Sequence, residues 1–141
     1  FSFYEGFITN ENIKFVSNKT YDLLSNATAA LVTSGTATLE TALFKVPEVV
    51  CYKGSSISYQ IAKRIITLKY ISLVNLIMDE EVVTELIQGN CNTKRIREEL
   101  KKILDSNYRQ NLLEKYHVLE EKLGGIGASQ KTAKLIVADL K

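Results

Sequence analysis

The chain has 141 residues, of which 45% are hydrophobic and 24% charged, and its formal net charge is +2 at pH 7. This length and hydrophobic fraction allow one core, so we expect a single domain over residues 1–141, and the mild charge argues against a nucleic-acid partner. The single histidine argues against a metal centre, and the two separated cysteines argue against a disulfide scaffold. No apolar run approaches the roughly 20 residues that a membrane-spanning helix needs, which argues against a transmembrane protein.

The first half of the chain alternates short β-branched runs with segments of helical periodicity. We expect a strand at 13–16, a helix at 20–25, a strand at 29–32, a helix after the turn at 33–36, and a strand at 49–52 that follows Pro47. The succession from Ala29 to Tyr52 is typical of a parallel βαβ unit in a doubly wound sheet.

The second half is predicted to be mostly helical. We expect a helix at 56–68, an extended segment at 70–76, helices at 79–86 (capped by Asp79), 93–104 (capped by Thr93) and 106–123, a stop at the glycines of 124–127, and a terminal helix at 128–140. The terminal helix has an apolar side made of Ala133, Ile136, Val137 and Leu140. The predicted fold class is therefore α/β: a Rossmann-like parallel sheet of three or four strands, with helices on both faces and a helical C-terminal region.

The polar turn Ser34-Gly35-Thr36 is the first candidate site. It opens a helix at the edge where the carboxyl ends of parallel strands meet, and backbone N–H groups and the helix dipole favour phosphate there. Glu40 lies one helical turn further on, where its carboxylate could accept hydrogen bonds from ribose hydroxyls. These residues favour a nucleoside diphosphate site. Ordinary helix capping by the turn and a solvated Glu40 remain the alternative, and neither a P-loop nor a GxGxxG motif is present.

A longer succession of motifs resembles the lipid-A-disaccharide synthase family. The motifs are SGTATLETALFKVPEVVCYK, SYQIAKRI, YISLVNLI and TELIQ, in this order between Ala29 and Gln88. They resemble the C-terminal, nucleotide-binding half of a GT-B glycosyltransferase. The chain departs from the family pattern at Val74, where the family has proline, and it lacks the family's Gly-Ser-Arg segment. We therefore expect a fragment of the C-terminal donor-binding domain, with the N-terminal acceptor domain absent from this chain.

The resemblance implies a reaction and a role for each matched site residue. The family transfers 2,3-diacylglucosamine from UDP to 2,3-diacylglucosamine 1-phosphate and releases UDP, as a step in lipid A biosynthesis, without a metal or another cofactor. On this basis Ser34–Thr36 hold the diphosphate, Glu40 holds the ribose, and Asn75 makes a donor contact that is essential for turnover. Tyr52 and Lys53 flank the nucleotide or an acyl chain. The general base is expected outside this chain, so the chain alone should be inactive. The structural alternatives are helix capping by Asn75 and a solvated Lys53.

The resemblance also implies a cytoplasmic bacterial protein that is peripheral on the inner face of the inner membrane, with a homo-oligomer as an open option. Lys63 and Arg64 are candidate contacts to anionic lipid, or else the solvated face of a helix. Two further functions stay open. One is another UDP-sugar enzyme such as a UDP-N-acetylglucosamine 2-epimerase, against which the segment YISLVNL argues. The other is a non-catalytic α/β interaction module, which a failure to bind uridine nucleotides would favour.

Overall fold

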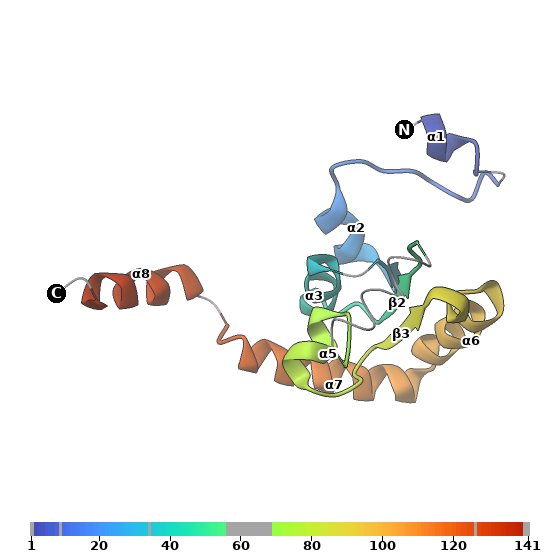
Figure 1. The fold of residues 1–141 in the computed structure, drawn as a ribbon. Helices are drawn as coiled ribbons and strands as arrows, with labels where there is room; N and C mark the ends of the chain where they lie inside the picture. Colours follow the sequence, from blue (N-terminus) through green and yellow to red (C-terminus); the bar gives the residue numbers. More distant parts are fainter. Residues whose placement is uncertain (1, 9, 34, 56–68, 126, 140–141) are drawn as a thin grey trace.

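A computed structural model describes residues 2–8, 10–33, 35–55, 69–125 and 127–139. In these ranges the chain forms a parallel sheet of three strands in the order β1-β2-β3 (Figure 1). The strands are β1 (Ala30–Val32), β2 (Glu48–Tyr52) and β3 (Thr84–Ile87). In this register Leu31 lies opposite Val49, and Val50 lies opposite Glu85. The parallel α/β fold predicted from the sequence is confirmed.

Helices cover both faces of the sheet, whereas α1 and α8 lie away from it (Figure 1). The helices of the described residues are α1 (Ser2–Glu5), α2 (Thr20–Asn26), α3 (Thr36–Leu43), α5 (Leu73–Met78), the 3-10 turn η1 (Gln88–Asn90), α6 (Thr93–Leu104), α7 (Ser106–Lys122) and α8 (Ala128–Asp139). The side chain of Thr84 donates to Glu99 of α6, whereas that of the next residue, Glu85, accepts from Asn75 of α5. Successive residues of a strand point to opposite faces, so α6 and α5 cover opposite faces of β3.

The core surrounds the central strand β2. Val49 and Val50 are both fully buried, one toward each face of the sheet, as expected for a strand that is covered on both sides. Ala42 of α3, Leu86 of β3 and Tyr116 of α7 complete the centre of the core. Helix α7 contacts α3, α5 and α6. Lys45, just after α3, donates to Glu120 of α7 at 2.6 Å and so fastens the two elements at the surface.

The extended segment predicted at 70–76 is wrong from Leu73 onward, because α5 begins there. The Ser72 side chain accepts a hydrogen bond from the backbone N–H of Asn75 at 3.2 Å, which is the geometry of a serine N-cap. Val74, a β-branched residue of this segment, therefore lies in a short capped helix, whereas Ile71 precedes it. The cap outweighs the strand propensity of Val74, because strand propensity depends strongly on a neighbouring strand.

The helix predicted at 79–86 is also wrong. Asp79 ends α5 in a left-handed conformation, with φ 54°, and the residues that follow lead into β3. Strand β3 hydrogen-bonds in parallel to β2 from Thr84 to Ile87. The pairing partner lies more than thirty residues earlier in the sequence, so local periodicity did not reveal it.

Residues 13–16, predicted as a strand, form an exposed irregular segment outside the three-stranded sheet. Strand propensity is expressed only where a residue fits a pleated, half-buried surface, and Ile13 is 51% exposed.

The predicted helices at 20–25, 93–104 and 106–123 and the helix after 33–36 are confirmed as α2, α6, α7 and α3. The cap of α6 is Asn92 rather than Thr93, since the Asn92 side chain accepts from the N–H of Arg95. The predicted helix at 56–68 lies outside the described residues.

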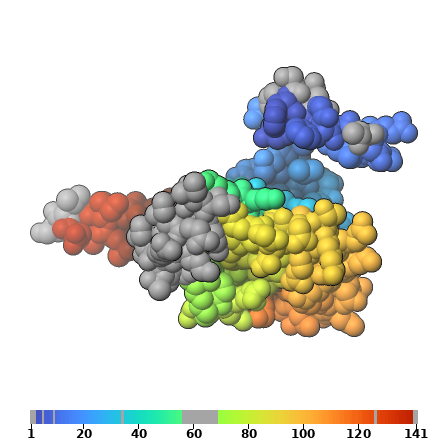
Figure 2. All heavy atoms as spheres, turned by 45° about the vertical axis from the view of Figure 1, so that its right-hand side comes forward, coloured from blue at the N-terminus to red at the C-terminus, as the bar shows by residue number. Residues whose placement is uncertain are grey.

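The terminal helix α8 extends away from the rest of the fold (Figures 1 and 2). Three glycines between α7 and α8 have positive φ: 78° at Gly124, 61° at Gly125 and 99° at Gly127. Such angles favour glycine, and they end α7 as the sequence predicts. The apolar side chains of α8 are exposed to solvent, including Leu135 at 72% and Ile136 at 56%.

Candidate functional site

The carboxyl edge of the sheet carries the turn that opens α3. Gly35 is the N-cap of α3, with φ 110° and ψ −158°, a region of backbone space that is essentially restricted to glycine. A Cβ added at Gly35 would meet nothing within 4 Å, so the backbone conformation rather than a lack of space requires glycine there. Gly35 and Thr36 are exposed, and the first turn of α3 presents N–H groups without intrahelical partners. Ser34, the first predicted site residue, lies outside the described residues.

Glu40 lies on the side of α3 that faces α2. It is half-buried and lines an open hollow of about 460 Å³ together with the start of α2 and the residues just before it. The other lining residues are Asn18, Lys19, Thr20, Tyr21 and Asp22. The structure therefore gives Glu40 polar surroundings that the sequence did not predict, and the proposed contact to ribose stays a prediction.

The residues that follow β2 and β3 are tied together at the carboxyl edge. Tyr52 and Lys53, both predicted site residues, are exposed at the end of β2. The backbone N–H of Gly54 donates to Oε1 of Gln88 at 3.1 Å. Gln88 follows β3 in a left-handed conformation, with φ 51°. Sequence reasoning missed Gln88 as a residue of this edge, although a polar residue directly after a strand is the signal that singled out Ser34–Thr36.

Asn75 is fully buried, and its amide is satisfied by hydrogen bonds within the fold. Nδ2 donates to the carbonyl of Val83 and to Oε1 of Glu85, both at 2.9 Å. Oδ1 accepts from the backbone N–H groups of Val82 at 2.8 Å and Val83 at 2.9 Å. Both amide hydrogens and both lone pairs are thus engaged. The structure gives Asn75 a defined structural task, which is to join α5 to the entrance of β3.

Glu85 is the second member of this contact. Its carboxylate accepts from the backbone N–H of Ile71 at 3.0 Å and that of Ser72 at 2.9 Å, in addition to the amide of Asn75. Hydrogen bonds to a charged acceptor are stronger than neutral ones. We call Asn75 and Glu85 the Asn75–Glu85 clamp, because the pair fixes the residues before α5 to β3.

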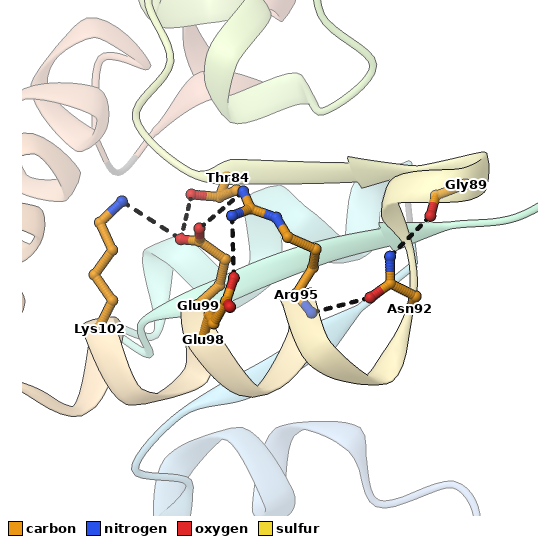
Figure 3. A network of polar contacts seen from close by, with 7 residues as sticks. All are labelled: Thr84, Gly89, Asn92, Arg95, Glu98, Glu99 and Lys102. Atoms are coloured by element: carbon orange, nitrogen blue, oxygen red, sulfur yellow. Dashed lines mark hydrogen bonds and ion pairs between the residues drawn. The ribbon is translucent and has the colours of Figure 1, made fainter.

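A separate polar network fastens α6 to the opposite face of β3 (Figure 3). Glu99 is buried, with 7% of its surface exposed. It accepts hydrogen bonds from Thr84 at 3.1 Å, Arg95 at 3.3 Å and Lys102 at 3.4 Å. The second guanidinium nitrogen of Arg95 contacts the more exposed Glu98 at 3.2 Å. A buried carboxylate held by two cations and a hydroxyl is a structural anchor here, since none of these residues belongs to the carboxyl edge of the sheet.

A buried carboxyl group lies at the other end of β2. Glu48, the first residue of this strand, is fully buried, and neither of its carboxyl oxygens has a hydrogen-bond partner in the part of the chain that the structure describes. Burial raises the pKa of Glu48 to about 9. The neighbouring Tyr116 has its own pKa raised, by burial first and then by the charge of Glu48. Glu48 is therefore protonated at neutral pH in the folded chain.

The described residues hold neither a metal-binding cluster nor a membrane-spanning helix. They contain no group of three or more His, Cys, Asp or Glu side chains arranged to hold a metal ion. Within the same residues, no helix is both long and apolar enough to cross a membrane.

The fold and the turn at Gly35 define an α/β domain with a Rossmann-like parallel sheet, whose carboxyl edge opens into an exposed helix start. A family model described as lipid-A-disaccharide synthetase matches residues 6–137 of this domain. The chain belongs to that family, as the motifs between Ala29 and Gln88 suggest.

Individual relatives agree with the family match. The chain is 36% identical over 97 residues to the lipid-A-disaccharide synthase of Geobacter sulfurreducens. This match covers 68% of the chain and 25% of the relative. It is 40% identical over 101 residues to the synthase of Nitrosococcus oceani, covering 71% of the chain and 26% of the relative. It is 38% identical over 96 residues to a synthase of Coxiella burnetii, and this match covers 67% of the chain and 26% of the relative. The chain thus spans about a quarter of the length of these relatives.

Proposed function

We propose that the chain is part of the C-terminal donor-binding domain of a lipid-A-disaccharide synthase, and that it acts with an acceptor domain that this chain does not contain. The observation that carries the proposal is Gly35. Its glycine-restricted conformation starts α3 at the carboxyl end of β1, and it leaves the first turn of the helix exposed to a ligand. In open α/β sheets ligands bind beyond the carboxyl ends of the strands.

The proposed reaction transfers 2,3-diacylglucosamine from UDP to 2,3-diacylglucosamine 1-phosphate. A base on the acceptor side removes the proton from the attacking hydroxyl, and UDP leaves on the opposite side. Charge develops on the diphosphate as it leaves, and N–H donors and the helix dipole at Ser34–Thr36 stabilise that charge. Glu40 accepts hydrogen bonds from the ribose hydroxyls, and Tyr52 and Lys53 flank the nucleotide.

Asn75 enters this proposal as a residue needed for turnover, acting through the fold. Its amide is fully engaged with Val82, Val83 and Glu85, so it holds α5 in place rather than reaching for the leaving group with a free donor. The substrates carry acyl chains, and we propose that the whole enzyme works at the cytoplasmic face of the inner membrane. These statements rest on the family and on the chemistry of its substrates.

The experiment is a calorimetric titration of UDP into the full-length protein and its Gly35→Ala variant. An alanine at φ 110° and ψ −158° forces the turn to move, so we expect the UDP dissociation constant to rise about tenfold or more. Gly89→Ala is the matched control, because Gly89 also has open space around it and no φ in the positive range. Unchanged UDP affinity in a folded Gly35→Ala protein would contradict the proposed site.

A further inference from the structure

The two cysteines of the chain lie together in the fold although they are far apart in the sequence. Cys51 is in β2, and Cys91 follows η1. Cys91 is close enough to Cys51 to interact with its thiol and to contribute to the raised pKa of that thiol. Both are free and half-buried, and both pack against the hydrophobic core.

The strand pairing explains why the two thiols meet. Cys51 lies opposite Leu86 in the parallel register of β2 and β3. The chain turns back immediately after β3, where the N–H of Cys91 donates to the carbonyl of Gln88 at 3.0 Å. The side chain of Gln88 in turn accepts from the N–H of Gly54, three residues after Cys51, at 3.1 Å. These two hydrogen bonds fold the turn against the end of β2 and bring Cys91 to the same end of the sheet as Cys51.

We propose that Cys51 and Cys91 form a reversible disulfide, a redox-modification site that joins β2 to the turn after β3, with a small-molecule disulfide such as oxidised glutathione as the oxidant. The thiolate of Cys91 attacks one sulfur of the oxidant, breaks its S–S bond and releases one glutathione. The thiolate of Cys51 then attacks the Cys91 sulfur of the mixed disulfide and releases the second glutathione. Two protein thiols are oxidised to one disulfide, and the two thiol protons are taken up by the two released glutathiones.

The surroundings of Cys51 set the order of these steps. Burial and the neighbouring Cys91 raise the pKa of the Cys51 thiol to about 11, so this thiol keeps its proton at neutral pH and is a poor first nucleophile. Cys91 therefore reacts first, and Cys51 resolves the mixed disulfide because it is already in contact with it. Since the second step needs the Cys51 thiolate, disulfide formation becomes faster as the pH rises. This inference concerns the two thiols alone and does not depend on the binding of UDP.

The test uses the reduced full-length protein, treated with oxidised glutathione at mildly alkaline pH, alkylated with iodoacetamide and mapped by mass spectrometry after digestion. We expect a cross-linked pair of peptides that contain Cys51 and Cys91, lighter by two hydrogens than the sum of the free peptides and separated again by dithiothreitol. We also expect the melting temperature of the oxidised protein to rise by several degrees, because the bond closes a long loop of the unfolded chain.

Two single variants serve as matched controls. C51S should trap glutathione on Cys91, because the resolving thiol is missing, whereas C91S should take up glutathione much more slowly than C51S. Neither variant should gain melting temperature on oxidation. Recovery of both cysteines as alkylated peptides from folded, oxidant-treated protein would overturn the proposal. Glutathione on both cysteines without a cross-link would overturn it as well.

Discussion

Asn75 and Glu85 are joined inside the fold, with Nδ2 of Asn75 donating to Oε1 of Glu85 at 2.9 Å. The same carboxylate receives the N–H groups of Ile71 and Ser72, and the oxygen of the same amide receives those of Val82 and Val83. One pair of side chains therefore satisfies the backbone on both sides of α5. Because the amide is fully buried and makes four hydrogen bonds within the fold, its main effect is on the stability of the fold and not on ligand binding.

Replacing Asn75 by alanine should lower the stability of the protein. The change leaves the N–H of Val83 without its acceptor, and an unsatisfied buried group costs about 1–3 kcal/mol. The N–H of Val82 loses one of two acceptors, because it also donates to the carbonyl of Glu80 at 3.0 Å. Urea unfolding and turnover measured on the same preparation of full-length protein test this expectation. Leu76→Ala is the matched control, since Leu76 is the next residue of α5 and is 36% exposed. Unchanged stability together with lost turnover would instead show that Asn75 contacts the donor directly.

The Glu48 carboxyl group should make the stability of the fold depend on pH. Its pKa is raised from 4.5 to about 9, so between these pH values the folded chain holds a proton that the unfolded chain releases. The free energy of unfolding therefore falls as the pH rises through this window and levels off above it. Glu48→Gln keeps the shape of the side chain and removes this titration, so its advantage over the native protein should grow from pH 5 to about pH 9. Urea midpoints at several pH values measure the difference, and parallel curves for the two proteins would refute the assignment.

The Glu99 network predicts a contrast between two neighbouring carboxylates of α6. Glu99→Ala removes the partner of Thr84, Arg95 and Lys102 from a buried position, and it should cost about 1–3 kcal/mol of unfolding free energy. Glu98→Ala removes one contact on the surface, where the side chain is 46% exposed, and such pairs contribute about 0–1 kcal/mol. Chemical denaturation of both variants measures the contrast. Equal losses for the two would mean that α6 is not anchored through Glu99.

The sequence predicted the first βαβ unit because its signals are local. Pro47 marks the break before β2, and the glycine at position 35 marks the start of α3. Strand β3 was missed because its pairing partner, β2, lies far away in the sequence, while residues 79–86 by themselves show a helical pattern. Local signals dominate where a cap or a turn decides the structure, and they fail where a distant strand decides it.

The candidate site shows the same division. The position of Gly35 at a carboxyl edge followed from the order of strand, turn and helix. The partners of Asn75 did not follow, because they lie seven to ten residues later and meet it only when β3 pairs with β2. The contact between Gly54 and Gln88 also depends on this pairing, so no motif in the sequence indicates it.

The three left-handed glycines between α7 and α8 divide the described chain into two thermodynamic units. None of the twelve residues of α8 is buried. Besides the hydrogen bonds within the helix, Lys131 donates to the carbonyl of Gly124, which belongs to the glycine segment and not to the core. Isolated helices of this length are marginal in water. Val49 and Val50, by contrast, open to solvent only when the whole sheet unfolds. In a hydrogen-exchange experiment the amides of α8 should therefore exchange before those of the sheet, and at a rate that does not depend on the stability of the core. Substitutions that weaken the sheet would then leave the exchange of α8 unchanged.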